Sequence, residues 1–287
     1  MNGKKITIED LFEAKGSGKK ITAVSCYDAM TARLVNQTDI DMILVGDSAA
    51  QLILGFDTTL PATMEFMTAI TAAVRRGAPD KFLVADMPFL SYQCGINEAV
   101  ANAGRFIVEA SAQMVKIEAA AAQLDVIKAV SQADIAVMAH IGIRPQSISK
   151  GKLRAKARDT EMAVELISLA EDMIEAGACS ILIEGAAAEA AGIITENSSV
   201  PVIGCGSGAD CDGQILVAPD ILGLTRMPPR FVKKYTDLAP EIMKAFILYS
   251  KEVREGRFPD GSHSYHMKPG EYERLKDVIG LTGPDDL

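Results

Sequence analysis

Short runs of branched apolar residues recur along the chain, and longer segments with helical spacing of apolar positions separate them. The runs have the length of strands and carry no polar face, which is typical of parallel strands covered by helices on both sides. Eight runs show this pattern: residues 21–28, 41–48, 81–89, 113–119, 135–142, 179–186, 200–208 and 213–224. Eight strand and helix repeats favour a closed (β/α)8 barrel over an open, doubly wound sheet.

Amphipathic helices are predicted between the strands and after them. Segment 97–112 places Ala99, Ala103 and Phe106 on one face, and segment 160–178 ends at a glycine, Gly177, that suits a helix C-terminus. A last helical segment, 238–256, is followed by a polar tail with two prolines at residues 257–272. We therefore expect a single barrel domain over residues 1–287, with a C-terminal helical extension and a tail that packs over the barrel or on a neighbouring subunit.

The charge balance narrows the range of partners. The formal net charge is -9, and no basic stripe lacks compensating acids, which argues against nucleic acid as a partner. No apolar stretch approaches the roughly 20 residues that span a bilayer, and the N-terminus carries no signal-peptide core. We expect a cytoplasmic protein that acts on small molecules without a membrane partner.

The number and spacing of cysteines and histidines indicate whether a zinc site is expected. The five cysteines form no C-x-x-C pair, and four of them lie in or beside apolar runs, which is typical of reduced, buried thiols. Only three histidines are present, and none has zinc-ligand spacing to a cysteine. A zinc site is therefore not expected.

Polar residues stand where the predicted strands end. In a parallel barrel all of these ends open on one face, where sites form. The residues are Tyr27, Asp28, Asp47, Ser48, Asp86, Lys116, Glu118, His140 and Glu184. A helix N-cap explains any single Asp or Ser, but Lys, Glu and His are poor N-caps, so the recurrence indicates a shared site.

The residue types indicate the chemistry. Asp47, Asp86 and Glu118 are hard oxygen donors that suit Mg²⁺, and Lys116 faces the same way as Glu118 because strand side chains alternate. A cation beside Mg²⁺ suits a 2-oxo acid, whose adjacent C–H is acidified when the metal polarises the keto oxygen. Glu184, from a later strand, is the candidate general base. A salt bridge at the barrel rim remains an alternative for Glu184, and an orienting role remains one for His140.

Two loops add weaker signals. The basic run at 150–158 is either a solvated loop or a contact for an anionic substrate. The glycine-rich stretch 202–214 is interpreted as the loop after strand seven, kept small so that the backbone can approach a ligand.

Several stretches resemble the ketopantoate hydroxymethyltransferase family (3-methyl-2-oxobutanoate hydroxymethyltransferases). They occur in the family's order over nearly the whole chain and include "LVGDS", "TTLPATMEFM", "LVADMPF", "MVKIE", "HIGIRPQS", "PVIGCGSG", "DGQILV" and "GRFPDGSHSY". The resemblance implies a (β/α)8 barrel of the phosphoenolpyruvate mutase/isocitrate lyase type. It also implies a homo-oligomer, a decamer in many members, and 5,10-methylenetetrahydrofolate as co-substrate.

The resemblance also implies roles for single residues. It places Mg²⁺ on Asp47 and Asp86 with Glu118 in the metal shell, and it makes Glu184 the catalytic base. Substrate binding would involve Asp47, Ser48, Asp86, Lys116 and His140, with His140 near the second substrate.

This chain departs from the family pattern near the predicted site. Ala49-Ala50 replaces a bulkier residue and a glycine of the family, Ala119-Ala120 replaces two glycines, and the 146–158 loop lacks the family's Gly-Gly-Tyr. The leading hypothesis is a Mg²⁺-dependent transfer of a hydroxymethyl group to 3-methyl-2-oxobutanoate, giving 2-dehydropantoate for pantothenate synthesis. The alternatives are the same enolate chemistry on another 2-oxo acid or with another one-carbon donor, and a C–C lyase or mutase of the wider superfamily.

Overall fold

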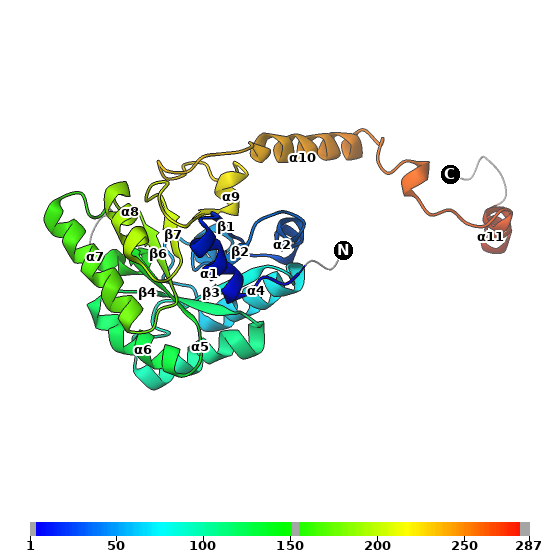
Figure 1. Cartoon of the computed structure of the whole chain (residues 1–287). Helices are drawn as coiled ribbons and strands as arrows, with labels where there is room; N and C mark the ends of the chain where they lie inside the picture. Colours follow the sequence, from blue (N-terminus) through cyan, green and yellow to red (C-terminus); the bar gives the residue numbers. More distant parts are fainter. Residues whose placement is uncertain (1–3, 151–154, 282–287) are drawn as a thin grey trace. The chain divides into compact units, whose positions relative to one another are not determined.

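The strands close into a barrel. A computed structural model describes residues 4–150 and 155–281, with the side chains of 148–150 left aside. Every strand pairs in parallel with its neighbours in the order β1 to β8, and β8 pairs with β1 (Figure 1). The strands are β1 (Ile21–Ser25), β2 (Met42–Val45), β3 (Phe82–Asp86), β4 (Met114–Glu118), β5 (Val137–Gly142), β6 (Ser180–Glu184), β7 (Val202–Cys205) and β8 (Gly213–Val217). The predicted closed barrel is confirmed.

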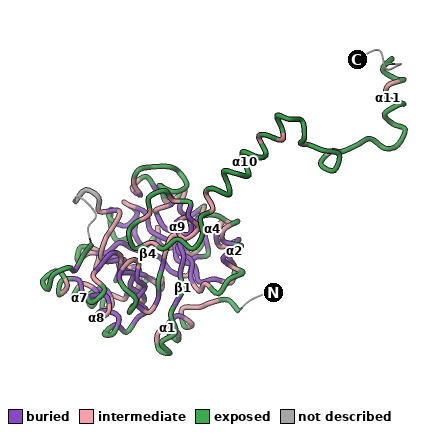
Figure 2. The backbone as a smooth tube through the Cα atoms, turned by 90° about the horizontal axis from the view of Figure 1, so that it is seen from above, coloured by how far each residue is buried: buried purple, intermediate pink, exposed green. Residues whose placement is uncertain are grey.

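Helices surround the strands. They are α1 (Ile8–Ser17), α2 (Ala29–Asn36), α3 (Ala49–Leu52), α4 (Met64–Gly77), α5 (Ile96–Ala110), α6 (Leu124–Gln132), α7 (Thr160–Glu175), α8 (Ala188–Asn197) and α9 (Ala218–Ile221), with 3-10 turns η1 (Ala121–Gln123) and η2 (Pro145–Lys150). The strands are almost wholly buried because helices cover their outer faces, as the unbroken apolar runs predict (Figure 2). The connection 206–212 between β7 and β8 contains no helix in the structure.

The last strand and the N-terminal helix differ from the prediction. The strand predicted over 213–224 ends at Val217, because Pro219 cannot donate to a sheet and instead stands in the first turn of α9. The N-terminal helix α1 was not predicted, although Thr7 and Asp10 form a capping box at its start.

Helix α1 closes one end of the barrel and leaves the other open. Its Leu11 packs into a cluster with inward-facing residues such as Ile21, Met42, Phe82 and Met114. The barrel interior is therefore filled with side chains from the N-terminal end upward, and only the C-terminal ends of the strands are free to form a site.

The residues after Thr236 form a second compact unit, Asp237–Leu287. It holds α10 (Leu238–Arg254), the 3-10 turn η3 (Gly261–His263) and α11 (Glu271–Ile279). The helix predicted over 238–256 is confirmed, and α11 begins at the end of the predicted tail and extends beyond it. Its signals were present: Glu271 and Glu273 in the first turn, and Gly280 as C-cap.

Residues 237–281 of this unit are mostly exposed (Figure 2). No residue of α10 or α11 is buried. Among the described residues, no helix combines the length and apolarity that crossing a membrane requires.

Candidate active site

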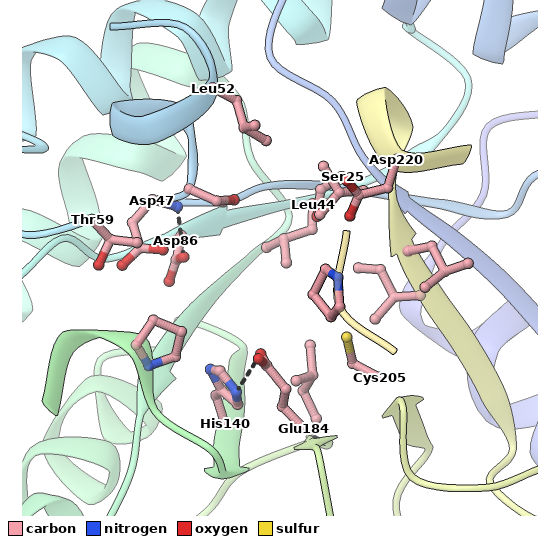
Figure 3. A pocket seen from close by; sticks show the side chains of 18 of the residues that line it. Ser25, Leu44, Asp47, Leu52, Thr59, Asp86, His140, Glu184, Cys205 and Asp220 are labelled. Atoms are coloured by element: carbon pink, nitrogen blue, oxygen red, sulfur yellow. Dashed lines mark hydrogen bonds and ion pairs between the residues drawn. The ribbon is translucent and has the colours of Figure 1, made fainter. Parts of the chain in front are cut away.

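The strand ends surround one cavity of about 390 Å³ within residues 1–236. Six of the seven predicted site residues line it: Asp47, Ser48, Asp86, Lys116, His140 and Glu184. Asp86 and Glu184 are the last residues of β3 and β6, Lys116 and His140 lie two residues before the ends of β4 and β5, and Asp47 and Ser48 follow β2. The shared face inferred from the sequence pattern is therefore present, and Figure 3 shows the two aspartates across the cavity from Glu184.

Asp86 is the centre of a bonded cluster of charges. Its Oδ1 lies 2.9 Å from the Lys116 ammonium, and its Oδ2 accepts a hydrogen bond of 2.8 Å from the backbone N–H of Asp47. Both Asp86 and Lys116 are buried. Neighbouring strands β3 and β4 produce this ion pair, because Asp86 and Lys116 are partners in the strand register.

Lys116 also reaches His140, and that contact determines which ring nitrogen carries the proton. Lys116 Nζ lies 3.2 Å from His140 Nδ1, and an ammonium can only donate, so Nδ1 accepts. The hydrogen of a neutral ring is then on Nε2, which lies 3.4 Å from Glu184 Oε2 (Figure 3). Asp86, Lys116, His140 and Glu184 thus form a continuous chain of contacts across the cavity.

Burial governs the titration of this cluster. It raises the pKa of Asp86 well above its usual value against the opposing charge of Lys116, and it raises the pKa of Glu118 to about 7. Burial also lowers the pKa of His140, and the Lys116 charge adds to that effect, so the ring is neutral near pH 7. For Lys116 burial acts against the charged form, but the carboxylates of Asp86, Asp47 and Glu118 outweigh it and raise the pKa.

Gln146 connects the predicted site residues, and its role was missed. It lies in η2, its backbone N–H donates to Glu118 Oε1 at 2.9 Å, and its Nε2 donates to Asp47 Oδ2 at 2.9 Å and to the Met87 carbonyl at 3.0 Å. Its Oε1 accepts from the Tyr92 hydroxyl at 2.7 Å. Every polar atom of this buried side chain is therefore used, and Glu118 is held behind the cavity instead of lining it.

Ser48 and Tyr27 form a second polar contact. Their hydroxyl oxygens lie 2.7 Å apart, and Tyr27 is buried. Ser48 stands at the start of the short helix α3 but makes no side-chain capping bond, so its hydroxyl is positioned by Tyr27. Asp28, the other polar residue at the end of the first predicted strand, is an N-cap of α2 that binds the N–H groups of Met30 and Thr31.

Both loops singled out in the sequence bear on the cavity rim. Part of the predicted basic loop, residues 151–154, lies outside the described residues. The backbone of Lys156 forms hydrogen bonds with Gly185 and Ala187, just after β6. In the glycine-rich stretch, Gly206 and Gly208 have positive φ angles, and a side chain there would meet Phe231 or Ala188. The approach of this backbone to a ligand stays a prediction.

The carboxylates are not arranged as a ready metal cage. Among the described residues, no group of three or more His, Cys, Asp or Glu side chains has the geometry to hold a metal ion. Yet Asp47, Asp86 and Glu118 are all buried and share one buried cation, Lys116. Such an excess of buried negative charge suits a divalent cation, and Mg²⁺ commonly keeps several waters and needs only one or two protein carboxylates.

The fold defines a structural class. Solved structures with the same architecture include phosphonopyruvate hydrolase with oxalate and Mg²⁺ (TM-score 0.59, 14% identity, 96% of this chain and 99% of that one). Phosphoenolpyruvate phosphomutase from Streptomyces platensis subsp. rosaceus is another (TM-score 0.60, 15% identity, 96% of each chain). A 2,3-dimethylmalate lyase of the phosphoenolpyruvate mutase/isocitrate lyase superfamily is a third (TM-score 0.59, 16% identity, 97% of this chain and 100% of that one). The predicted fold class is confirmed.

Sequence relatives narrow the class to a family. The model of ketopantoate hydroxymethyltransferase matches residues 5–261. Proteins named 3-methyl-2-oxobutanoate hydroxymethyltransferase share 46% identity in Hyperthermus butylicus (96% of each chain) and 46% in Geotalea daltonii (92% of this chain, 99% of that one). The chain belongs to the ketopantoate hydroxymethyltransferase family and is an enzyme of hydroxymethyl transfer. The resemblance inferred from its motifs is confirmed.

Proposed function

We propose that the protein adds a hydroxymethyl group to carbon 3 of 3-methyl-2-oxobutanoate, giving 2-dehydropantoate, a step of pantothenate synthesis. The names of relatives that are 41–46% identical over most of the chain support this substrate. The solved lyases and mutases, at 12–17% identity, share only the fold with this chain, which leaves those rival activities without comparable support. The observation that carries the proposal is the chain of contacts from Asp86 through Lys116 and His140 to Glu184.

Mg²⁺ fits the acidic side of the cavity. We propose that Asp47 and Asp86 hold it and that Glu118 contributes from behind, through its link to Gln146. A bound Mg²⁺ would supply Lewis-acid polarisation of the keto oxygen. Asp86 already presents one carboxylate oxygen, Oδ1, that has Lys116 beside it but no hydrogen bond of good geometry.

The rest of the cavity fits a small branched 2-oxo acid. Lys116 places a buried positive charge beside the substrate's carboxylate and keto oxygens, and Ser48 adds a hydroxyl held by Tyr27. Apolar side chains of Leu44, Leu182 and Ile215 line the same cavity, so the isopropyl group would be removed from water.

Glu184 is the proposed base that removes the proton from carbon 3. Its carboxylate faces His140 Nε2, which is 3.4 Å away and has no other hydrogen-bond partner among the described residues. Because Lys116 occupies Nδ1, the neutral imidazole directs an N–H at Glu184 and orients the carboxylate without taking its role as base. His140 is therefore proposed as a positioning residue.

The one-carbon donor and the assembly are also proposals. The donor is 5,10-methylenetetrahydrofolate, as the family resemblance implies. Helix α10 exposes large apolar side chains, including Phe246 at 69% and Ile247 at 68%, and such a surface is typical of a helix that packs against another chain. We therefore propose a homo-oligomer of this chain. The cytoplasmic location stays a prediction from the sequence.

A product assay tests the proposed function. The purified protein with Mg²⁺ and methylenetetrahydrofolate is given 3-methyl-2-oxobutanoate, and straight-chain 2-oxo acids serve as comparison substrates. NMR should detect 2-dehydropantoate, with kcat/KM at least ~10-fold higher for the branched acid, because one or two methyl groups in an apolar pocket are worth about 1–3 kcal/mol. A stronger preference for another acid would contradict the proposed substrate. Product formed from formaldehyde at an equal kcat/KM would contradict the proposed donor.

A further inference from the structure

Asp220 is a carboxylate in the cavity for which the proposed reaction has so far no use. It lies on α9, just after β8, and is 7% exposed. Its side chain lines the same cavity as Asp47 and Glu184, and Figure 3 shows it on the side away from Asp47 and Asp86. Among the described residues no donor or cation forms a hydrogen bond or ion pair with this carboxylate.

The Asp220 carboxylate differs from that of Asp86 in its contacts. Among the described residues it has no protein donor and borders the cavity, whereas the two oxygens of Asp86 lie against Lys116 and the Asp47 N–H. The Asp220 carboxylate therefore lacks donors that a ligand in the cavity could provide.

The 2-oxo acid is not that ligand. It is an anion, and its counter-charge, Lys116, is on β4, which stands across the barrel from β8 in the strand order. Asp220 would repel a carboxylate placed near it. The wall that includes Asp220 therefore suits the other substrate, and specifically a part of it that carries N–H donors and no negative charge.

Two neighbours in the sequence complete this wall. The Thr225 hydroxyl is buried with no hydrogen-bond partner among the described residues, and Thr225 lines the cavity. Phe231 also lines it and is fixed from behind by contact with Gly206. We call Asp220, Thr225 and Phe231 the open wall: it presents an acceptor, a free hydroxyl and a flat apolar ring.

We propose that the open wall binds the pterin ring of the folate donor, with the Asp220 carboxylate accepting hydrogen bonds from the N3–H and 2-amino groups of that ring. These two donors are parallel and adjacent, so a carboxylate meets them in the bidentate way in which it meets a guanidinium. Thr225 provides a polar partner for the ring edge, and Phe231 an apolar face for the ring plane. The assignment rests on the proposed function, because it takes a folate as the donor.

Equilibrium binding of tetrahydrofolate tests the assignment directly. Calorimetry compares the wild-type chain with Asp220→Asn, which keeps the side-chain size but removes the charge. We expect Kd to rise at least ~10-fold, because the charged acceptor of both hydrogen bonds is lost. The matched control is Asp210→Asn, an exposed acid on the β7–β8 connection that lines no cavity, and its Kd should stay within about 2-fold of wild type. A Kd for Asp220→Asn equal to that of the control would overturn the assignment.

A second arm does not depend on the variant's folding. A tetrahydrofolate analogue with a methyl group in place of the 2-amino group should bind the wild-type chain at least ~10-fold more weakly than tetrahydrofolate. In Asp220→Asn the same change should cost less than about 3-fold, because the acceptor is already lost. Equal discrimination by both proteins would also overturn the role of Asp220.

Failure of this assignment is distinguishable from failure of the proposed function. If wild-type protein forms 2-dehydropantoate with the folate donor but Asp220→Asn binds tetrahydrofolate normally, only the open wall is wrongly assigned. If wild-type protein neither binds tetrahydrofolate nor uses the donor, the proposed donor is wrong and the assignment is overturned with it.

Discussion

The acidic residues on the two sides of the cavity differ in their hydrogen-bond and ion-pair partners. On the side of β2 to β4, Asp86 is bonded to Lys116 and to the backbone of Asp47, and Asp47 is bonded to Gln146. On the side of β8, Asp220 has no such partner. The first side is organised by the protein's own contacts, and we propose that a ligand completes the open wall. In this account the 2-oxo acid is activated on the organised side and the donor is recognised separately.

Asp86→Asn should have the largest effect on the organised side. It removes the partner of Lys116 and a proposed metal oxygen together, so we expect kcat/KM to fall at least ~10³-fold. Steady-state kinetics at saturating Mg²⁺ measures this, with Asp210→Asn as the control for an Asp→Asn change outside the cavity. Activity within 10-fold of wild type would show that the organised side does not carry the chemistry.

Glu118 predicts a pH dependence of stability in the protein without added metal. Its folded pKa is about 7 against a reference near 4.5, so between these values the folded chain binds more protons than the unfolded one. The free energy of unfolding should therefore fall as pH rises from 4.5 to 7.5, by up to about 3 kcal/mol from this group. Urea titrations at both pH values give the free energy of unfolding of wild type and Glu118→Gln. An equal change in that free energy between the two pH values in both proteins would contradict the prediction.

Gln146→Ala tests whether the organised side depends on its connections. The change leaves Asp47 and the Tyr92 hydroxyl without their partner, and loss of such supporting contacts typically weakens metal binding or activity 10- to 100-fold. The Mg²⁺ concentration for half-maximal activity should rise by that factor. Gln132→Ala, at an exposed position on α6, should leave it unchanged. If Gln146→Ala reaches half-maximal activity at the same Mg²⁺ concentration as wild type, the hydrogen bonds of Gln146 do not support metal binding.

Tyr27→Phe should have the smallest effect. It removes one hydroxyl that positions Ser48, and a single neutral hydrogen bond contributes about 1 kcal/mol, so KM for the 2-oxo acid should rise about 3- to 10-fold with little change in kcat. Initial rates over a range of 2-oxo acid concentrations measure both constants. A fall in kcat with an unchanged KM would place Tyr27 in the chemistry instead of in substrate binding.

The same contrast explains how much the sequence could predict. Asp47, Asp86, Lys116 and Glu184 lie within two residues of strand ends, and strand position is set by local patterns of apolar residues. Gln146 lies in a 3-10 turn after β5. Its contacts depend on the path of a loop, and the pattern of apolar residues does not predict that path. Its partner Tyr92 follows β3 in another such loop.

Asp220 was missed for a different reason. It lies inside an apolar run that was interpreted as one long strand, and that interpretation places it among core positions. Pro219 was the signal that the strand ends earlier and that Asp220 starts a new element at the rim. The family motifs gave no role to this residue, and only its burial without a partner in the structure draws attention to it.

The most direct test of the account is the exchange of the carbon-3 proton of 3-methyl-2-oxobutanoate for deuterium, followed by NMR with Mg²⁺ and no folate. Because the organised side and Glu184 suffice for proton removal in this account, wild-type protein should catalyse the exchange without the donor. Glu184→Gln, which keeps the side-chain size but removes the base, should lower the rate at least ~10²-fold. Exchange that requires the donor, or that proceeds at the wild-type rate in Glu184→Gln, would contradict the division of the cavity and move the base elsewhere.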